Sequence, residues 1–470
     1  MTRFLKGRTS TFLAVFAAIF VFSSCSLFQQ EKSRTTGWTL GDPEAGEFGR
    51  SEIRVQDPGP GMVPIEGGSF LMGRTDEDVM RDWNNIPRRV SVASFFMDET
   101  EISNFEYREY LHWLNRVFGS NHQRFLDALP DTLVWRDPLA YNEPFVENYL
   151  RHPAYDDYPV VGVSWVQAAN YAAWRTDRVN EWILIENGYL EMNLDEQTPG
   201  NHFTTLGYLS GTYEGLVRED IQRRVRWEDG LLFPRYRLPT EAEWEFAALG
   251  LIGSTYSESI YDRRIYPWDG RNVRSAERHT RGKFMANFQR GAGDLTGIAG
   301  YQNPGGDITM PVYSFLPNDY GLYNMAGNVN EWVKDVYRPL SHETVAEFRP
   351  YRGNIFRTIA RDEDGNVLFD AETGEVIYEE MEDGVRNYRQ GDFINYRDGD
   401  DMSAISDDFP VYPENQTLIS NQSRVYKGGS WRDRVYWLSP ATRRHLDQNQ
   451  ATNDIGFRCA MDQIGGAQSQ

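Results

Sequence analysis

The sequence predicts a body that combines helices with short strands and contains few long regular elements. Three observations support this prediction. Three helix starts share one capping signature, short apolar runs flank a Gly-Gly pair, and aromatic residues make up 14% of the 470 residues. Gly is also abundant, with 41 residues, and most of the chain follows neither the helical nor the strand period for long. We therefore expect buried aromatic side chains and hydrogen-bonded loops to hold the body together.

The first residues predict export. Basic residues lie within the first eight positions, an uncharged apolar run covers residues 12–22, and Ser23 and Ser24 precede Cys25. This order is typical of a secretory signal, and the run is shorter than the roughly 20 residues that span a bilayer. Because the signal ends in Cys, it resembles a lipidation motif; an ordinary signal peptide with an accidental Cys is the alternative. We predict a signal peptide at 1–24 and an outer-membrane lipid anchor on Cys25.

Charge and cysteine content limit the ligands that this protein can bind and the disulfides that it can form. The net charge is −21, which disfavours binding to nucleic acid. The chain has two cysteines, Cys25 and Cys459, so a lipid on Cys25 would leave no disulfide within the mature chain. The core must then be stable without one. We expect Cys459 to be an unreactive core residue.

After the signal, a polar stretch at 25–60 predicts a tether, and the folded body is expected to cover 61–465. Within MVPIEGGSFLMG, residues 62–73, apolar runs on both sides of Gly67 and Gly68 predict two strands around a turn.

Three helix starts follow the pattern of a capping box. In each, a Ser or Thr is followed three residues later by Glu or Gln, so that the two side chains can satisfy each other's backbone amides. Each pair precedes an amphipathic, aromatic-rich run, namely FEYREYLHWL, WVQAANYAAW and EAEWEFAAL. The pairs are Ser103 with Glu106, Ser164 with Gln167, and Thr240 with Glu243.

An acidic insert is predicted at about 340–425. Between Asp362 and Asp408 the chain has 16 Asp or Glu residues against 3 Arg and no Lys. Residues 366–378 alternate apolar and polar side chains and contain Thr-Gly, which predicts a hairpin. Residues 391–408 are expected to form a solvated loop, with binding of calcium or of a basic partner as alternatives.

Seven motifs in order carry a family resemblance. They are MVPIEGGSFLMG, FFMDETEISNFEYREY, YPVVGVSWVQAANYAAW, YRLPTEAEWEFAA, YGLYNMAGNVNEWV, YKGGSW and IGFRCA. Together they resemble the formylglycine-generating-enzyme, or sulfatase-modifying factor, family over about residues 60–462. The resemblance implies an α+β fold of the C-type-lectin-like kind that is low in regular secondary structure. It also implies an ancestral reaction, the oxidation of a substrate Cys at a copper ion held by two thiolates.

The lipidation motif, the length and the acidic insert after NEWVKDVYRP are similar to the gliding-motility lipoproteins of the type IX secretion system. This likeness implies a place on the periplasmic face of the outer membrane. It further implies self-association in a ring and a periplasmic partner of the GldN or PorN type. We expect the insert at 340–425 to contact a neighbouring subunit or that partner.

The family's copper thiolates are expected five residues apart after the Gly-Gly-Ser motif. The matching positions here are Asp433 and Leu438. Cu(I) prefers soft thiolates, which neither residue supplies, so we expect no copper and no oxidase activity. Two other functions stay open, an enzyme with relocated ligands and a lipoprotein that binds glycans. Arg443 and Arg444 fall where the family shapes its substrate groove, although a surface salt bridge explains them equally well.

Calcium is the one metal that the resemblance implies. In NMAGNVNE, the side chains of Asn324 and Glu331 and the carbonyls of Gly327 and Val329 match the family's calcium pattern. Oxygen donors of this kind suit a hard cation. The alternative is a metal-free Gly turn that Trp332 packs against.

A second calcium site is implied at ANFQRG. The side chain of Asn287 and the carbonyl of Phe288 match its start, and Asp294 or Asp307 could complete it.

Overall fold

The computed structural model describes part of the chain. The described residues are 32–40, 56–75, 78–79, 81, 83–192, 197–213, 224–250, 264–291, 307–338, 348, 350–353, 357–362, 365–370, 376–380 and 422–465. The signal peptide, Cys25, Asp294 and the predicted loop at 391–408 lie outside them.

The chain divides into two compact units. The smaller unit comprises Met1–Val55 and Arg226–Leu231. Its described part contains a turn closed by a bridge between Lys32 and Thr39, and the short 3-10 helix η4 (Trp227–Asp229). The larger unit comprises Gln56–Val225 and Leu232–Gln470 and forms the body.

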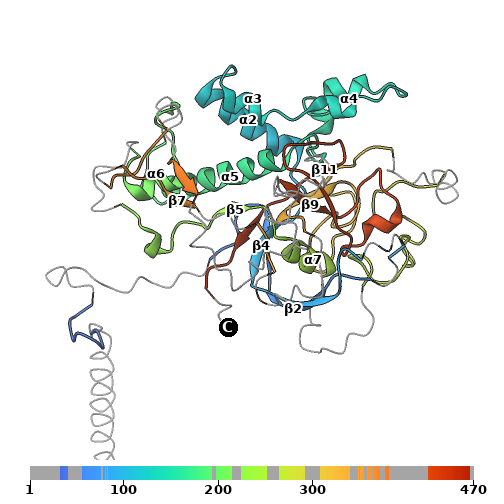
Figure 1. Cartoon of the computed structure of the whole chain (residues 1–470), viewed down its shortest axis with the longest axis horizontal. Coiled ribbons are helices and arrows are strands. Elements are labelled where there is room, and N and C mark those ends of the chain that lie inside the picture. Colours follow the sequence, from blue (N-terminus) through green and yellow to red (C-terminus); the bar gives the residue numbers. More distant parts are fainter. Residues whose placement is uncertain are drawn as a thin grey trace, which may run out of the picture. The chain divides into compact units, whose positions relative to one another are not determined.

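Two four-stranded sheets form the centre of the body (Figure 1). One has the antiparallel order β1-β4-β12-β5, and the other has the order β10-β9-β6-β11, in which β11 runs parallel to β6. The strands of the first sheet are β1 (Met62–Ile65), β4 (Phe95–Asp98), β12 (Ala460–Asp462) and β5 (Tyr236–Arg237). Those of the second are β10 (Arg444–Asp447), β9 (Ser423–Lys427), β6 (Asn330–Val336) and β11 (Ile455–Gly456).

The two strands predicted around Gly67 and Gly68 are confirmed, but they do not pair with each other. The first is β1, which pairs with β4. The second, β2 (Gly68–Met72), pairs with β3 (Arg88–Val92) in a separate two-stranded sheet. The Gly67 amide donates instead to Ser94 Oγ at 3.0 Å. The Gly-Gly pair therefore carries the chain from one sheet to another.

All three predicted capping boxes are confirmed. They open α2 (Asn104–Phe118), α5 (Trp165–Glu186) and α7 (Glu241–Leu249). In each, the hydroxyl of the cap accepts from the third helical amide, and the Glu or Gln there accepts from the amide of the cap. Replacing such a cap by Ala typically costs about 1 kcal/mol, so these signals contribute to stability as well as marking the boundaries.

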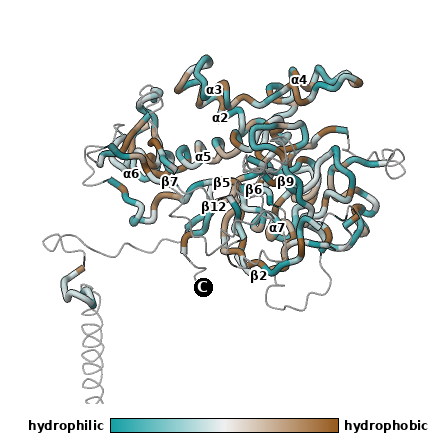
Figure 2. Tube along the Cα trace, in the orientation of Figure 1, coloured by the Kyte–Doolittle hydropathy of each residue, from teal (hydrophilic) through white to brown (hydrophobic). Residues whose placement is uncertain are grey.

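The remaining helices of the described residues are short. They are α3 (Gln123–Ala128), α4 (Glu143–Asn148), α6 (Thr205–Ser210), and the 3-10 helices η2 (Thr132–Trp135), η3 (Pro153–Tyr155) and η8 (Val435–Leu438). Apolar and polar residues are interleaved along α2 and α3 (Figure 2). Among the described residues, no helix has both the length and the apolar character needed to cross a bilayer.

Aromatic packing forms the core, as the composition predicted. The rings of Tyr107 from α2 and Tyr171 from α5 stack with centroids 5.7 Å apart, and the Phe457 ring meets both edge-on. Trp244 of α7 and Trp332 of β6 are fully buried. The expected α+β fold, with short strands and aromatic packing, is therefore confirmed.

The predicted hairpin of the insert is described on both sides of its turn. Phe369 forms an antiparallel bridge with Val376, and β7 (Arg357–Ile359) pairs antiparallel with β8 (Tyr378–Glu380). Both pairings agree with a hairpin, whose predicted Thr373-Gly374 turn lies outside the described residues.

Candidate functional site

The predicted copper positions and the first set of predicted calcium positions lie on two segments at the start of β6. One segment, Asn324 to Glu331, runs into the strand, and the other runs from Gly428 into η8. Three contacts join these two segments. The Gly327 amide donates to the Gly428 carbonyl at 2.9 Å, Trp431 N donates to Asn328 O at 2.9 Å, and Asn330 Nδ2 donates to Asp433 Oδ2 at 3.1 Å. The two sets of family positions are thus neighbours.

Asp433, at the first copper position, is held as an ion-paired carboxylate. Arg444 of β10 donates to both of its oxygens at 2.7 Å, and the Ser430 hydroxyl donates to Oδ2 at 2.7 Å. Burial tends to raise the pKa of Asp433, but the hydrogen bonds and positive charge of Arg444 outweigh it, and the pKa lies below its usual value. This carboxylate is charged and saturated with donors.

Leu438, at the second copper position, is a core residue. It has no exposed surface and packs in an apolar cluster with Tyr266, Ala286 and Phe288. Its side chain has no ligand atom. The two family positions therefore contain one saturated hard oxygen ligand and one hydrocarbon, where Cu(I) chemistry requires two thiolates.

The predicted calcium loop surrounds a buried carboxylate that sequence reasoning missed. Asn324 Nδ2 donates to Glu101 Oε2 at 2.8 Å, and Asn328 Nδ2 donates to Glu101 Oε1 at 3.0 Å. Burial, opposed mainly by Arg458, raises the pKa of Glu101 to about 8. Glu101 lies two residues before the Ser103 cap, and the only signal that could have found it is the acidic run DETE.

Glu331, the predicted charged ligand of this loop, is already paired. Arg458 donates to Oε1 through Nη2 and to Oε2 through Nε, each at 2.7 Å, and Trp244 Nε1 donates to Oε2 at 2.7 Å. Glu331 and Arg458 both have no exposed surface. The Arg of the IGFRCA motif therefore neutralises the carboxylate from the family's calcium pattern.

The second predicted calcium position touches the first. Asn328 N donates to the carbonyl of Asn287 at 2.8 Å, and Asn287 Nδ2 donates to the Ile308 carbonyl at 2.8 Å. Gly327 has φ +83°, and an added Cβ there would lie 2.4 Å from Asn287 O, so only Gly fits this approach. The side chain of Phe288 is buried in the apolar cluster around Leu438. The structure thus brings the two family calcium segments together.

The oxygen donors of the loop fit a hard cation in part. Asn324 Oδ1 is buried and has no hydrogen-bond partner among the described residues, which leaves one oxygen open to a cation. Asn324 also holds the left-handed conformation, with φ 54°. In the described part of the chain, no group of three or more His, Cys, Asp or Glu residues gathers as a metal site. Any ion here would depend chiefly on neutral oxygens.

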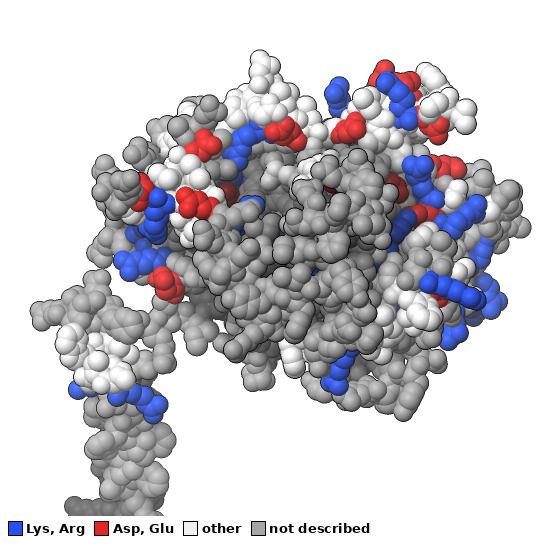
Figure 3. Space-filling model, viewed as in Figure 1, with Lys and Arg blue, Asp and Glu red and all other residues white. Residues whose placement is uncertain are grey.

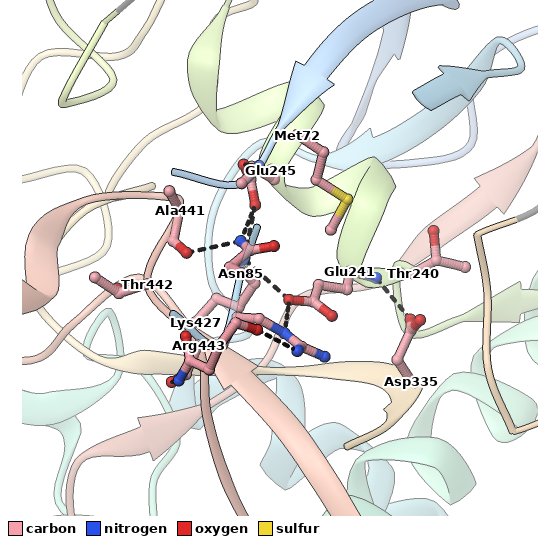
Figure 4. A network of polar contacts seen from close by, with 12 residues as sticks. Met72, Asn85, Thr240, Glu241, Glu245, Asp335, Lys427, Ala441, Thr442 and Arg443 are labelled. Atoms are coloured by element: carbon pink, nitrogen blue, oxygen red, sulfur yellow. Dashed lines mark hydrogen bonds and ion pairs between the residues drawn. The ribbon is translucent and has the colours of Figure 1, made fainter. Parts of the chain in front are cut away.

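A second buried ion cluster lies between α7 and β9 (Figure 4). Lys427 Nζ lies 3.2 Å from Glu241 Oε1 and 2.9 Å from Glu245 Oε2, and Arg443 Nε lies 2.6 Å from Glu241 Oε1. Burial alone would raise the pKa of Glu241, but the charges of Arg443 and Lys427 lower it to about 2. The four groups balance two negative charges with two positive ones, as a buried cluster requires.

Arg443 and Arg444 do not form the surface salt bridge considered above. The Arg443 side chain is 2% exposed and pairs with Glu241, while Arg444 is part-buried against Asp433. Both guanidinium groups are therefore paired with carboxylates, and Arg443 also lines a cavity beside Tyr436 and Trp437.

Cys459 is a free thiol with no exposed surface, as expected. Burial raises its pKa well above the usual range. The thiolate needed for redox chemistry or metal binding is therefore disfavoured.

Asp335 lies beside the α7 cluster and differs from the other acids. Its Oδ2 accepts from the Glu241 amide at 2.7 Å, and its Oδ1 accepts weakly from Arg352 N at 3.4 Å. Burial, together with the negative charge of Glu241, raises the pKa of Asp335 to about 7 from 3.8. The folded protein therefore binds a proton here that the unfolded chain releases at lower pH.

We expect Asp335→Asn to reduce the pH dependence of stability. Because the pKa is raised on folding, the contribution of Asp335 is fully present below pH about 4 and is lost as pH rises through about 7. The slope is at most about 1.4 kcal/mol per pH unit. Urea unfolding between pH 4.5 and 8 should show the variant gaining stability relative to wild type as pH rises. The exposed control Asp137→Asn should run parallel to wild type, and an unchanged slope in Asp335→Asn would refute this account.

A family model and several known proteins that resemble this chain all point to the same protein family. A model of the sulfatase-modifying factor enzyme 1-like domain matches residues 47–463. The formylglycine-generating enzyme of Mus musculus is 26% identical over 294 residues, which are 62% of this chain and 61% of that protein, so this chain spans about three fifths of the mouse enzyme. The enzyme of Thermomonospora curvata is 27% identical over 62% of this chain and 76% of its own. The mouse inactive C-alpha-formylglycine-generating enzyme 2 is 29% identical over 60% and 71%.

Proposed function

This chain belongs to the sulfatase-modifying factor enzyme 1-like family, and we propose that it is a non-catalytic member with a structural role in a secretion machine. One observation carries the non-catalytic part. Asp433 is locked in an ion pair with Arg444, and Leu438 is buried in the apolar core. The protein named inactive C-alpha-formylglycine-generating enzyme 2 illustrates that the family contains members without the activity.

The specific assignment is to the GldK or PorK type of gliding-motility lipoprotein, with the paralogous GldJ type as the alternative. The signal sequence ending at Cys25 and the acidic insert between β6 and β9 support it. We propose that the lipid on Cys25 anchors the chain to the periplasmic face of the outer membrane. There the body would associate with copies of itself and with a partner of the GldN or PorN type.

The test is purification of the tagged full-length protein from membranes. We expect the wild type to fractionate with the outer membrane and to bring down a stable periplasmic partner. The Cys25→Ala variant should be lost from the outer membrane, because it lacks the thiol that would carry the lipid. A Cys25→Ala variant that stays in the membrane after salt washing, or a wild type purified without partners, would contradict the proposal.

We also propose that calcium binds at Asn324, Gly327, Val329 and Glu331. The second predicted calcium segment, which begins with Asn287 and Phe288, lies beside this loop through the contact of Asn328 N with Asn287 O. The open Oδ1 of Asn324 supports this, and the pairing of Glu331 with Arg458 predicts that the site is weaker than one with a free carboxylate ligand. A bound ion would fix the loop rather than take part in a reaction.

Chelation is expected to lower the melting temperature, since an ion bound only to the native state adds about 2.7 kcal/mol at a hundredfold excess over its dissociation constant. The matched variant is Asn324→Gly, which tolerates φ 54° but lacks the open oxygen. Thermal melts with calcium and with chelator should differ for the wild type and coincide for this variant. If the wild type has the same melting temperature with calcium and with chelator, the loop is a metal-free turn.

A further inference from the structure

The body of this acidic protein carries a dense group of positive charges. Residues 264–291 contain seven Lys or Arg against two Asp or Glu, whereas the whole chain has a net charge of −21. Figure 3 shows Lys and Arg side chains gathered on the right of the molecule. We define the basic patch by five exposed residues, which are Arg278, Arg281, Lys283, Arg432 and Arg434.

Two segments far apart in sequence form this patch. Arg434 Nη1 donates to the Arg290 carbonyl at 3.0 Å, and Gln289 N donates to the Asp433 carbonyl at 2.8 Å. These contacts hold residues 264–291 against the start of η8.

The backbone under the patch is fixed by packing. The guanidinium groups of Arg274 and Arg290 lie 3.9 and 4.2 Å from the ring centroid of Phe284. The Gly282 amide donates to Ser275 O at 2.8 Å, which closes the loop that carries Arg278 and Arg281. The exposed charges are thus presented by an ordered surface.

The charges of the patch are not neutralised within the described body. None of its five residues forms an ion pair with another described residue. Of the nearby acids, Asp269 pairs with Arg264 and Asp433 pairs with Arg444. Glu277 is exposed beside the patch, and Asp454 accepts hydrogen bonds from Ser430 and Asn330. The surface therefore remains strongly positive, as a docking site for an acidic partner requires.

The chain itself contains a segment of matching charge. Residues 362–408 have 16 Asp or Glu against 3 Arg, a net charge of −13. The insert that contains this segment follows β6 in sequence, and Val336, at the last position of β6, donates from its amide to Arg352 O at 3.1 Å. The basic patch adjoins the other end, where Asn330 contacts Asp433. A strand of this length separates the two ends by about 20 Å, and Figure 1 places β7 on the opposite side of the body from η8.

We propose that the basic patch is a docking surface for the acidic segment 362–408 of a second copy of this chain. The proposal rests on the structural role proposed above and identifies a surface that performs it. A copy that docks its acidic segment on the next copy keeps its own basic patch free for a third, so the contacts can continue from copy to copy. Such head-to-tail contacts repeat, and they close into a ring when the rotation between copies permits.

Three forms of the full-length protein in neutral detergent test this proposal by mass photometry at low and high salt. The wild type should form oligomers that dissociate as salt screens the charges. The double variant Arg278→Glu and Arg281→Glu should associate about tenfold more weakly or worse. Replacing 362–408 by a Gly-Ser linker should have the same effect. The control Arg151→Glu with Arg235→Glu, at exposed positions outside the patch, should behave as wild type.

Mixing the two defective forms gives the decisive result. The linker form keeps the patch and the charge-reversed form keeps the acidic segment, so together they should form one-to-one dimers and nothing larger. No dimer on mixing would overturn the proposal and indicate docking within one chain or no docking. Oligomers that persist in both variants would overturn it too.

Binding of the patch to phosphatidylglycerol vesicles without self-association would assign the patch to lipid binding instead. Co-purification of the periplasmic partner is a separate readout, so the structural role can stand if this surface fails.

Discussion

Replacing Arg458 by Met is expected to lower the free energy of unfolding by about 3–5 kcal/mol, the usual cost of breaking a fully buried ion pair. Arg458 donates to both oxygens of Glu331 at 2.7 Å and to the carbonyl of Tyr323 at 2.8 Å. It also donates to the Asp98 carbonyl at 3.1 Å, where β4 ends. Its removal would leave a carboxylate with no exposed surface and no cation beside it.

The double variant Arg458→Met with Glu331→Leu separates charge from packing. Replacing both partners by apolar residues removes the unpaired charge, so we expect it to recover much of the lost stability. Arg136→Met is the matched control, because its pair with Glu143 is exposed and should contribute little. The measurement is urea unfolding with chelator present, which excludes any effect through calcium. A midpoint for Arg458→Met equal to that of the control would contradict the central place of this pair in the fold.

Local signals predicted three of the helices, α2, α5 and α7, and did not predict the shorter ones. A capping box involves residues three apart, so the pairs at Ser103, Ser164 and Thr240 could be read directly from the sequence, and all three open helices. The strands beside Gly67 and Gly68 were also predicted, but their partners were not. Pairing depends on β4 and β3, which lie farther along the chain, and no local pattern specifies that choice.

The polar core could not be predicted from spacing. Glu101 and Asn324 are hydrogen-bonded although they lie 223 positions apart in the sequence, and Glu331 pairs with Arg458 from 127 positions away. The family pattern suggested Glu331 as a free calcium ligand. Only the fold shows that the guanidinium of Arg458 already pairs with its carboxylate.

Charge counting found the acidic insert because its residues are contiguous. It missed the basic patch, since Arg432 and Arg434 join residues 264–291 only in the folded body.

We propose that this chain keeps the family fold without the family's oxidation chemistry. The proposal depends on Asp433 and Leu438, the positions that the family resemblance predicts for two copper thiolates. Asp433 has both oxygens bound by Arg444, and Leu438 has no exposed surface. Binding Cu(I) here would break an ion pair and open an apolar cluster without supplying a soft ligand.

The most direct test is oxidation of a Cys-containing sulfatase peptide by the purified protein, supplied with Cu(I) and oxygen. The formylglycine-generating enzyme of Thermomonospora curvata, run under the same conditions, serves as the positive control. Aldehyde in the peptide is measured by mass spectrometry, and bound copper by elemental analysis of the protein after desalting. We predict no retained copper and no aldehyde above the level without protein. Formylglycine that accumulates in proportion to the protein added would contradict the claim.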